Sequence, residues 1–173
     1  MEDAASLARL VDALHPWLGH LVIVGGWAHR LHRFHELAGA PAYQPVRTRD
    51  VDLALSLTAP LPGDIREALE QAGFKGRFSR DNTPPVTHYH LGEDDGGFYA
   101  EFLTPLLGAE VKRSGKPDVT ASKAGINAQK LRYLDLLLVA PWSVRLGPEV
   151  GVSLSRRRTC CCRTPPASSF RSC

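Results

Sequence analysis

Residues 21–28, Leu-Val-Ile-Val-Gly-Gly-Trp-Ala, decide how the chain folds. The first four are apolar and mostly β-branched, which is typical of a buried strand. After the two glycines, apolar residues recur at helical spacing up to Ala38. Gly25 and Gly26 lack side chains, so backbone N–H groups there can approach a phosphate closely, and the following helix presents its positive N-terminal end at the same place. An ordinary tight turn uses the same dipeptide, so both interpretations stay open.

A second strand is predicted over residues 50–57, where apolar residues alternate with polar or small ones. Asp50 and Asp52 stand two positions apart near its start, so both carboxylates point the same way and can reach one cation. Two carboxylates this close also repel each other, which favours a shared divalent metal. The alternative is a solvated polar face on an edge strand.

A third acidic residue, Glu101, interrupts the apolar stretch Phe-Tyr-Ala-Glu-Phe-Leu over residues 98–103. Strand alternation places Glu101 on the same face as Tyr99 and Leu103. Burying a carboxylate is unfavourable unless a cation or hydrogen-bond donors compensate. Glu101 is therefore a candidate third ligand, and the alternative is a surface glutamate on a half-exposed strand.

The remaining segments with clear patterns mix helices and strands. Spacing predicts a helix over residues 4–18 and a short one over 64–72. Residues 86–91 and 98–103 are predicted to form a hairpin, and residues 131–139 are apolar enough to be core as strand or helix. Together they predict an α/β or α+β fold, a mixed β-sheet with helices packed against it.

These features together resemble the nucleotidyltransferase superfamily related to DNA polymerase β. Its members carry an apolar strand, Gly-Gly or Gly-Ser, a helix, two aspartates one residue apart on the next strand, and a further acid on a later strand. The counterparts here are residues 22–27, residues 48–53 and Glu101. The chain is most similar to small bacterial nucleotidyltransferases, which include antibiotic-modifying enzymes and toxin-type families of abortive-infection systems. The resemblance covers residues 5–140 and implies the nucleotidyltransferase fold.

The resemblance also implies an activity and a set of site residues. A Mg²⁺-dependent enzyme would move a nucleoside monophosphate, with ATP as the expected donor, to an acceptor hydroxyl and release pyrophosphate. The acceptor would be a small molecule, an RNA end or a protein hydroxyl, and an antitoxin-type protein is an expected partner. Glu101 would complete a second metal site or act as general base. Metal binding and catalysis are assigned to Asp50, Asp52 and Glu101, and nucleotide binding to Gly25, Gly26 and Arg49.

Composition agrees with one globular domain in the cytoplasm. The chain has 173 residues, of which 43% are hydrophobic and 23% are charged. No apolar run approaches the ~18 residues that a membrane-spanning helix needs. Residues 1–154 contain no cysteine, which fits a cytoplasmic enzyme without disulfides.

The last nineteen residues differ from the rest. Residues 155–173 hold five arginines, all four cysteines and no acid, so residues 1–154 keep 16 basic against 18 acidic residues. The body is thus slightly acidic, which argues against a large nucleic-acid footprint. We expect a nucleotidyltransferase-like domain over residues 1–154, truncated at its C-terminal side, followed by a disordered tail that could be out-of-frame sequence.

Two other functions stay open at this stage. A truncated domain of this fold could bind a nucleotide or a partner without transferring anything, and the arginine-rich tail could bind nucleic acid. Weaker candidates include Lys130 as a triphosphate ligand, Trp27 as a core anchor, and His88 and His90 as cross-strand packing residues. Three histidines could share one helical face and bind a metal, although a polar helix face is the commoner role: His29, His32 and His35.

Overall fold

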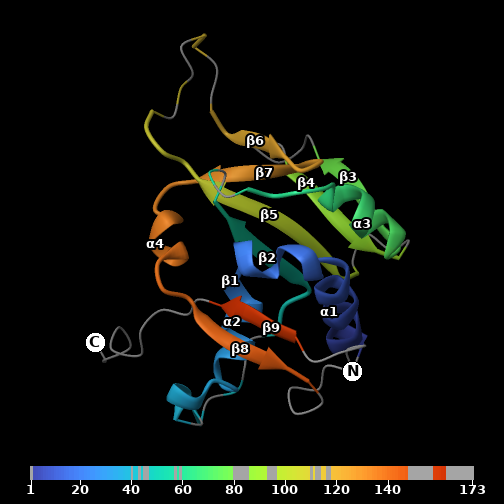
Figure 1. The fold of residues 1–173 in the computed structure, drawn as a ribbon, viewed down its shortest axis with the longest axis vertical. Helices are drawn as coiled ribbons and strands as arrows, with labels where there is room; N and C mark the ends of the chain where they lie inside the picture. The colour runs from blue at the N-terminus through green and yellow to red at the C-terminus, as the bar shows by residue number, and fades with distance from the viewer. Residues whose placement is uncertain are drawn as a thin grey trace.

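The protein is described from a computed structural model (Figure 1). It describes the following residues: 2–39, 41–42, 44, 47–56, 58, 60–79, 86–92, 97–109, 111, 114–115, 118–147 and 158–162. The helices are α1 (Glu2–Ala13), η1 (His15–His20), α2 (Gly25–His32), η2 (Glu36–Ala38), α3 (Ile65–Gln71) and α4 (Asp135–Leu138). The strands are β1 (Leu21–Val24), β2 (Asp50–Leu55), β3 (Phe74–Ser79), β4 (Val86–Leu91), β5 (Tyr99–Pro105), β6 (Thr120–Lys123), β7 (Ile126–Leu131), β8 (Trp142–Leu146) and β9 (Arg158–Cys162).

All the strands belong to one mixed sheet with the order β3-β4-β5-β2-β1-β9-β8, and β7 pairs with both β5 and β6. At the centre, β2 is antiparallel to β1 and parallel to β5. The expected mixed sheet with packed helices is therefore observed. Because β2 has a partner on each side, the alternative of a solvated edge strand does not apply to it.

The two faces of the central strands differ in what covers them. The face of β2 and β5 that carries Val51, Leu53 and Phe102, here called the core face, packs with helices α1, α2 and α3 into the main hydrophobic core. The opposite face, here called the carboxylate face, carries Asp52 and Glu101. Its far end is covered by α4, which forms a smaller apolar cluster with β1, β2 and β5.

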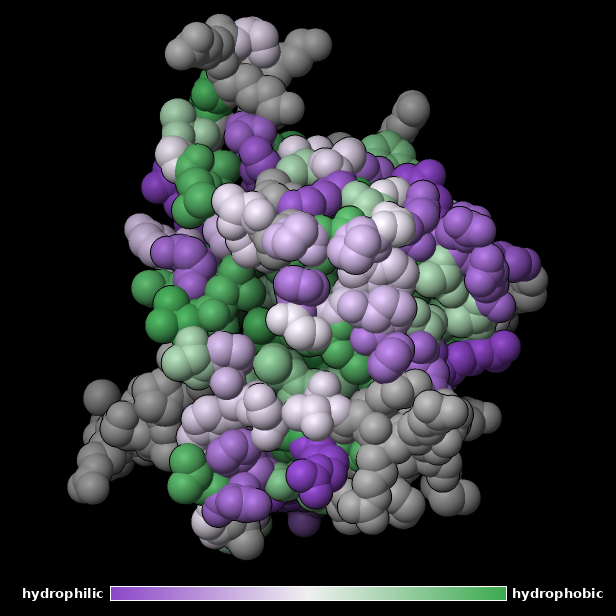
Figure 2. Space-filling view, in the orientation of Figure 1, coloured by the Kyte–Doolittle hydropathy of each residue, from purple (hydrophilic) through white to green (hydrophobic). Residues whose placement is uncertain are grey.

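Apolar side chains remain exposed on α4 and on the residues that flank it. Tyr133, Leu136 and Val139 are 72%, 59% and 63% exposed. Figure 2 shows hydrophobic surface gathered over this helix, at the left of the view. None of the helices formed by the described residues is long and apolar enough to span a membrane.

Local sequence explains where most elements begin and end. The helix expected over residues 4–18 ends at Ala13 and continues as a 3₁₀ helix, because Pro16 has no N–H to donate. Asp64 caps α3 by accepting a hydrogen bond from the Glu67 amide at 3.0 Å. The predicted hairpin is confirmed as β4 and β5, and the apolar residues 131–139, for which both strand and helix were open, contain α4.

Five residues of the segment expected to be disordered form β9 instead. This strand pairs with β1 in parallel and with β8 in antiparallel orientation. Cys160 and Cys162 are only 2% and 1% exposed and lie in the main core. The prediction of disorder is therefore corrected over residues 158–162, since a buried cysteine packs as a small apolar residue and β9 covers the edge of β1. The rest of the tail lies outside the described residues.

Candidate active site

Two central strands bring the predicted acidic residues onto one face. In the parallel pairing of β2 and β5, Asp50 lies opposite Tyr99, and Asp52 lies opposite Glu101. The carboxyl groups of Asp52 and Glu101 are close enough to share a hydrogen bond. Residues 49 positions apart in sequence thus meet through strand register.

The two glycines lie directly against this group. Val24, the last residue of β1, pairs with Asp52, so α2 begins beside the Asp52 carboxylate. Gly25 has φ +66°, and a Cβ atom on it would overlap the Asp52 carboxylate. A Cβ atom on Gly26 would likewise overlap the side chain of Thr48. Neither position has room for a side chain while Asp52 and Thr48 hold their places.

The clustered carboxylates are electrostatically unfavourable in the absence of a cation. Burial raises the pKa of Asp52 to about 8, assisted by the hydrogen bond to Glu101 and by the charges of Glu101 and Asp50. Asp52 therefore carries a proton at neutral pH unless positive charge enters the site. A bound divalent ion would favour the ionised form of the same group.

The hairpin supplies two aromatic neighbours of the carboxylates. His88 Nε2 lies 3.2 Å from Glu101 Oε2, and burial lowers the pKa of His88 despite the opposing effect of Asp50. The neutral imidazole can therefore donate its N–H to Glu101. The Tyr99 ring contacts His88 and stacks on His90, with centroids 4.7 and 5.2 Å apart.

Sequence reasoning placed His88 and His90 on one face but assigned them only to cross-strand packing. That role describes His90, whose ring stacks on Tyr99. It misses the contact between His88 and Glu101. The signal was present in the hairpin itself, since pairing Tyr89 with Ala100 sets His88 opposite Glu101.

The residues just before β2 contact the same site. The Thr48 hydroxyl donates a hydrogen bond to Asp50 Oδ1. The Arg49 carbonyl accepts a hydrogen bond from the Tyr99 amide at 3.3 Å, which joins the start of β2 to the start of β5. The Arg49 side chain is exposed, and its role in nucleotide binding stays a prediction.

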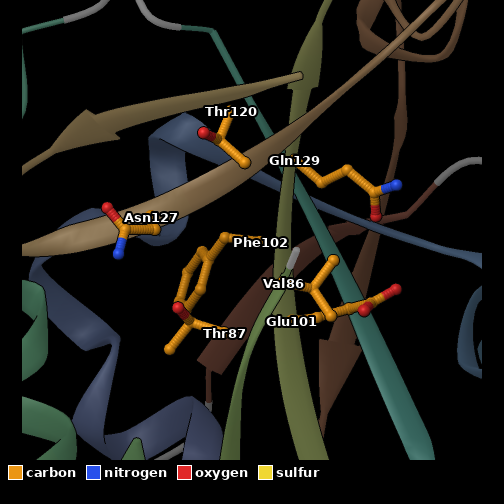
Figure 3. Close-up of a pocket in the computed structure, with 7 residues that line it drawn as sticks. All are labelled: Val86, Thr87, Glu101, Phe102, Thr120, Asn127 and Gln129. Carbon is orange, nitrogen blue, oxygen red and sulfur yellow. The ribbon is translucent and has the colours of Figure 1, made fainter. Parts of the chain in front are cut away.

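A small cavity lies beside Glu101, lined by residues of β4, β5, β6 and β7. Its volume is about 10 Å³, room for about one water molecule, and Figure 3 shows the residues that line it. It exists because β4 pairs with β5 at residues 99–100 while β7 pairs with it only from residue 103, so both strands leave β5 uncovered in between. In Figure 3, Glu101 and Phe102 point to opposite sides of β5. The cavity is far too small for a nucleotide, which would have to bind on the open carboxylate face.

The carboxylates offer the kind of ligand that Mg²⁺ binds. Carboxylate oxygens are the ligands that Mg²⁺ prefers, and a bound cation would favour the ionised form of Asp52, whose pKa burial raises. Within the described ranges, however, no three His, Cys, Asp or Glu side chains already lie in a geometry that holds a metal ion. The carboxylates thus fit Mg²⁺ in their chemistry and in the sheet face that they share, and Mg²⁺ is usually held by one or two carboxylates together with phosphate oxygens and water.

The weaker candidates are engaged in structural contacts. His32 and His35 stack on Trp142, with ring centroids 4.9 and 4.3 Å away. Lys130 Nζ lies 2.6 Å from Asp118 Oδ2. Trp27 is buried against Phe98, as expected of a core anchor.

Comparison with known proteins agrees with this geometry. No curated protein and no solved structure matches the chain. A family model described as nucleotidyltransferase matches residues 2–156, which include the glycines, the aspartates and Glu101. The chain therefore belongs to this nucleotidyltransferase family.

Proposed function

We propose that the protein transfers a nucleoside monophosphate from a nucleoside triphosphate, with ATP as the donor, to an acceptor hydroxyl in a Mg²⁺-dependent reaction. One observation carries the proposal: Asp52 faces Glu101 across parallel strands, directly beside the glycines that begin α2. A half-buried group of carboxylates beside side-chain-free backbone suits a metal-bound triphosphate. The acceptor is a hydroxyl of a small molecule, an RNA end or a protein, and an antitoxin-type partner would bind over the same open face.

Each site residue has a role in this reaction. Asp50 and Asp52 would hold Mg²⁺, which when bound neutralises charge on the phosphate oxygens. The backbone at Gly25 and Gly26 would approach the triphosphate, and Arg49 would contact it from the start of β2. Glu101 would accept the proton of the acceptor hydroxyl as its oxygen attacks the α-phosphorus. The bond between the α-phosphorus and the bridging oxygen then breaks, and pyrophosphate leaves.

Calorimetric titration of ATP in Mg²⁺ and in EDTA tests the first half of the proposal. The wild type should bind ATP in Mg²⁺, and both Asp50→Asn and Asp52→Asn should weaken binding at least about tenfold. Asp135→Asn is a matched control, because Asp135 is an exposed aspartate at the start of α4, outside the site. It should bind ATP like the wild type.

Two outcomes would contradict the proposal. Binding that is equal in EDTA, or equal in the two aspartate variants, would show that the nucleotide site lies elsewhere. A folded wild type that binds no ATP would favour a non-catalytic member of the fold. Release of labelled pyrophosphate in the presence of candidate acceptors then tests the transfer itself, with Glu101→Gln expected to bind ATP but to release pyrophosphate at least about 100-fold more slowly.

A further inference from the structure

A second cleft lies on the other side of the sheet from the carboxylates. It has a volume of about 250 Å³, and Arg66 and Glu70 of α3 line it together with residues of β3 and β4. Figure 1 shows α3 beside these two strands. Thr87 and Tyr89 point into it from β4 and alternate along that strand with His88, which faces Glu101. The cleft therefore opens on the opposite side of β4 from Glu101, although Thr87 and Asn127 also line the small cavity beside Glu101.

The cleft ends on buried hydroxyl groups without partners. Tyr89 is fully buried, and its ring is held edge-on against Phe102 with centroids 5.6 Å apart. Among the described residues, no group forms a hydrogen bond with the hydroxyl of Tyr89 or of Thr87. Buried hydroxyls are almost always paired, so a cleft lined by two unpaired ones is organised to receive polar atoms from outside.

Most polar groups around the cleft can donate hydrogen bonds. Burial raises the pKa of Tyr89, although Arg66 acts in the opposite direction, so the phenol stays a donor. The Arg66 guanidinium lies near that hydroxyl, outside hydrogen-bond geometry. Asn127 Oδ1 accepts from the Ser122 hydroxyl at 2.5 Å, which leaves the amide nitrogen of Asn127 as the group that can serve the cleft.

This set of donors fits a compact anion better than a neutral or cationic group. Arg66 adds a positive charge, and a carboxylate can accept from a guanidinium and a hydroxyl at once. Phe78 is 56% exposed at the rim and offers an aromatic surface to an apolar group. Glu70, one helical turn from Arg66, would repel a carboxylate and confine it to the Arg66 and Tyr89 side.

We propose that this cleft binds a small carboxylate whose flat apolar part packs on Phe78, with Arg66, Tyr89 and Thr87 holding the carboxylate oxygens. The size of the cleft suits a molecule of one ring and one short arm, below the range of drug-sized ligands. The site is independent of the proposed nucleotidyl transfer, because it faces away from Asp52 and Glu101.

Calorimetric or NMR titration of the full chain with phenylacetate tests the proposal. Phenylacetate should bind saturably, and 2-phenylethanol, which keeps the ring but lacks the charge, should bind about tenfold more weakly. Arg66→Gln and Tyr89→Phe should each weaken phenylacetate binding about tenfold, and Glu70→Gln should strengthen it. Arg145→Gln, which removes an exposed arginine on β8, is the matched control and should bind like the wild type.

Three results would overturn the proposal: no saturable binding up to on the order of 10 mM phenylacetate, equal affinity for 2-phenylethanol, or unchanged affinity in both Arg66→Gln and Tyr89→Phe. Misfolding does not obscure the outcome, because Tyr89→Phe keeps the buried ring and removes only the unpaired hydroxyl. Thr87→Val, a second variant of similar shape, should weaken binding as well. Since ATP binding in Mg²⁺ is measured separately, failure here leaves the nucleotidyltransferase proposal intact.

Discussion

The two faces of β2 and β5 carry neighbouring residues in opposite physical states. On the core face, Val51, Leu53 and Phe102 are at most 3% exposed and are packed by helices. On the carboxylate face, Asp52 and Glu101 are half-buried and oppose each other, which raises the pKa of Asp52. The sheet is thus stabilised from one side, while the other side holds an arrangement that is unfavourable without a cation. That division is expected where a fold supports a reactive site.

The largest expected effect is a difference in the free energy of unfolding between variants of two adjacent residues on β5, Glu101 and Phe102. Phe102→Ala should lower the free energy of unfolding by about 3–5 kcal/mol, because it empties part of the core. Glu101→Gln should change it by less than about 1 kcal/mol, because it removes only a half-buried charge among like charges. Urea unfolding followed by circular dichroism measures both. Equal losses in the two variants would show that the two faces do not divide stability and chemistry in this way.

The next largest effect concerns Gly25, which begins α2 and lies against the Asp52 carboxylate. Gly25→Ala should cost about 2 kcal/mol, because it adds left-handed backbone strain and an overlap with Asp52. Gly39 is a matched control, since it has a similar φ of +62° but nothing within 4 Å of its Cβ position. Gly39→Ala should therefore cost only the strain, about 1 kcal/mol.

ATP titration is a second way to compare the two glycine variants, since only Gly25→Ala should also weaken ATP binding in Mg²⁺. If both glycine variants lose the same stability and bind ATP equally well, the close approach of Gly25 to Asp52 has no functional weight.

The two faces of the sheet also differ at β9. Cys162 lies in the main core, whereas Cys161 is half-buried against the smaller cluster on the other face. Cys162→Ser should cost about 1–3 kcal/mol, because it buries a hydroxyl, and Cys161→Ser should cost less.

Thiol labelling of the native protein at pH 8 gives an independent measurement. Burial raises the pKa of Cys162 to about 12, with a smaller contribution from Cys161, so Cys162 should react only after unfolding. Fast native labelling of Cys162 would mean that β9 does not pack as described.

The smallest effect has the opposite sign. Asp52→Asn should stabilise the protein by about 1 kcal/mol in EDTA at pH 8, which corresponds to a rise in Tm of about 2–4 °C; the partial exposure of Asp52 limits the size. The folded pKa of Asp52, about 8, lies above the unfolded value of 3.8, so folding favours the protonated form. Stability of the wild type therefore falls as pH rises from about 4 to 8.

The difference in Tm between Asp52→Asn and the wild type should accordingly be small at pH 4.5 and largest at pH 8, and Asp135→Asn should show neither effect. Thermal unfolding in EDTA at the two pH values measures this. A variant that is less stable than the wild type at pH 8 would mean that Asp52 stabilises the fold as an ion.

Much of the fold could be predicted because its central elements have simple periods. The run of apolar residues in β1, the alternation in β2 and the cap at Asp64 each indicate their structure locally. Strands β3 and β8 were not predicted. β3 contains a glycine and charged residues, so its order comes from pairing with β4 and not from a local pattern. Strand β9 was not predicted within the tail, because composition does not reveal that Cys160 and Cys162 pack as core residues.

The sequence by itself determined that Asp50 and Asp52 share a face, since strand alternation is a property of the backbone, and that a side-chain-free turn stands between the first strand and its helix. Tertiary structure alone decided that Gly25 contacts Asp52, that Glu101 meets Asp52 through a parallel register, and that His88 reaches Glu101. It also decided which hydroxyls of the α3 cleft stay unpaired. These contacts depend on strand order and register, which arise from how all the elements bury their apolar faces together, and no local pattern encodes that choice.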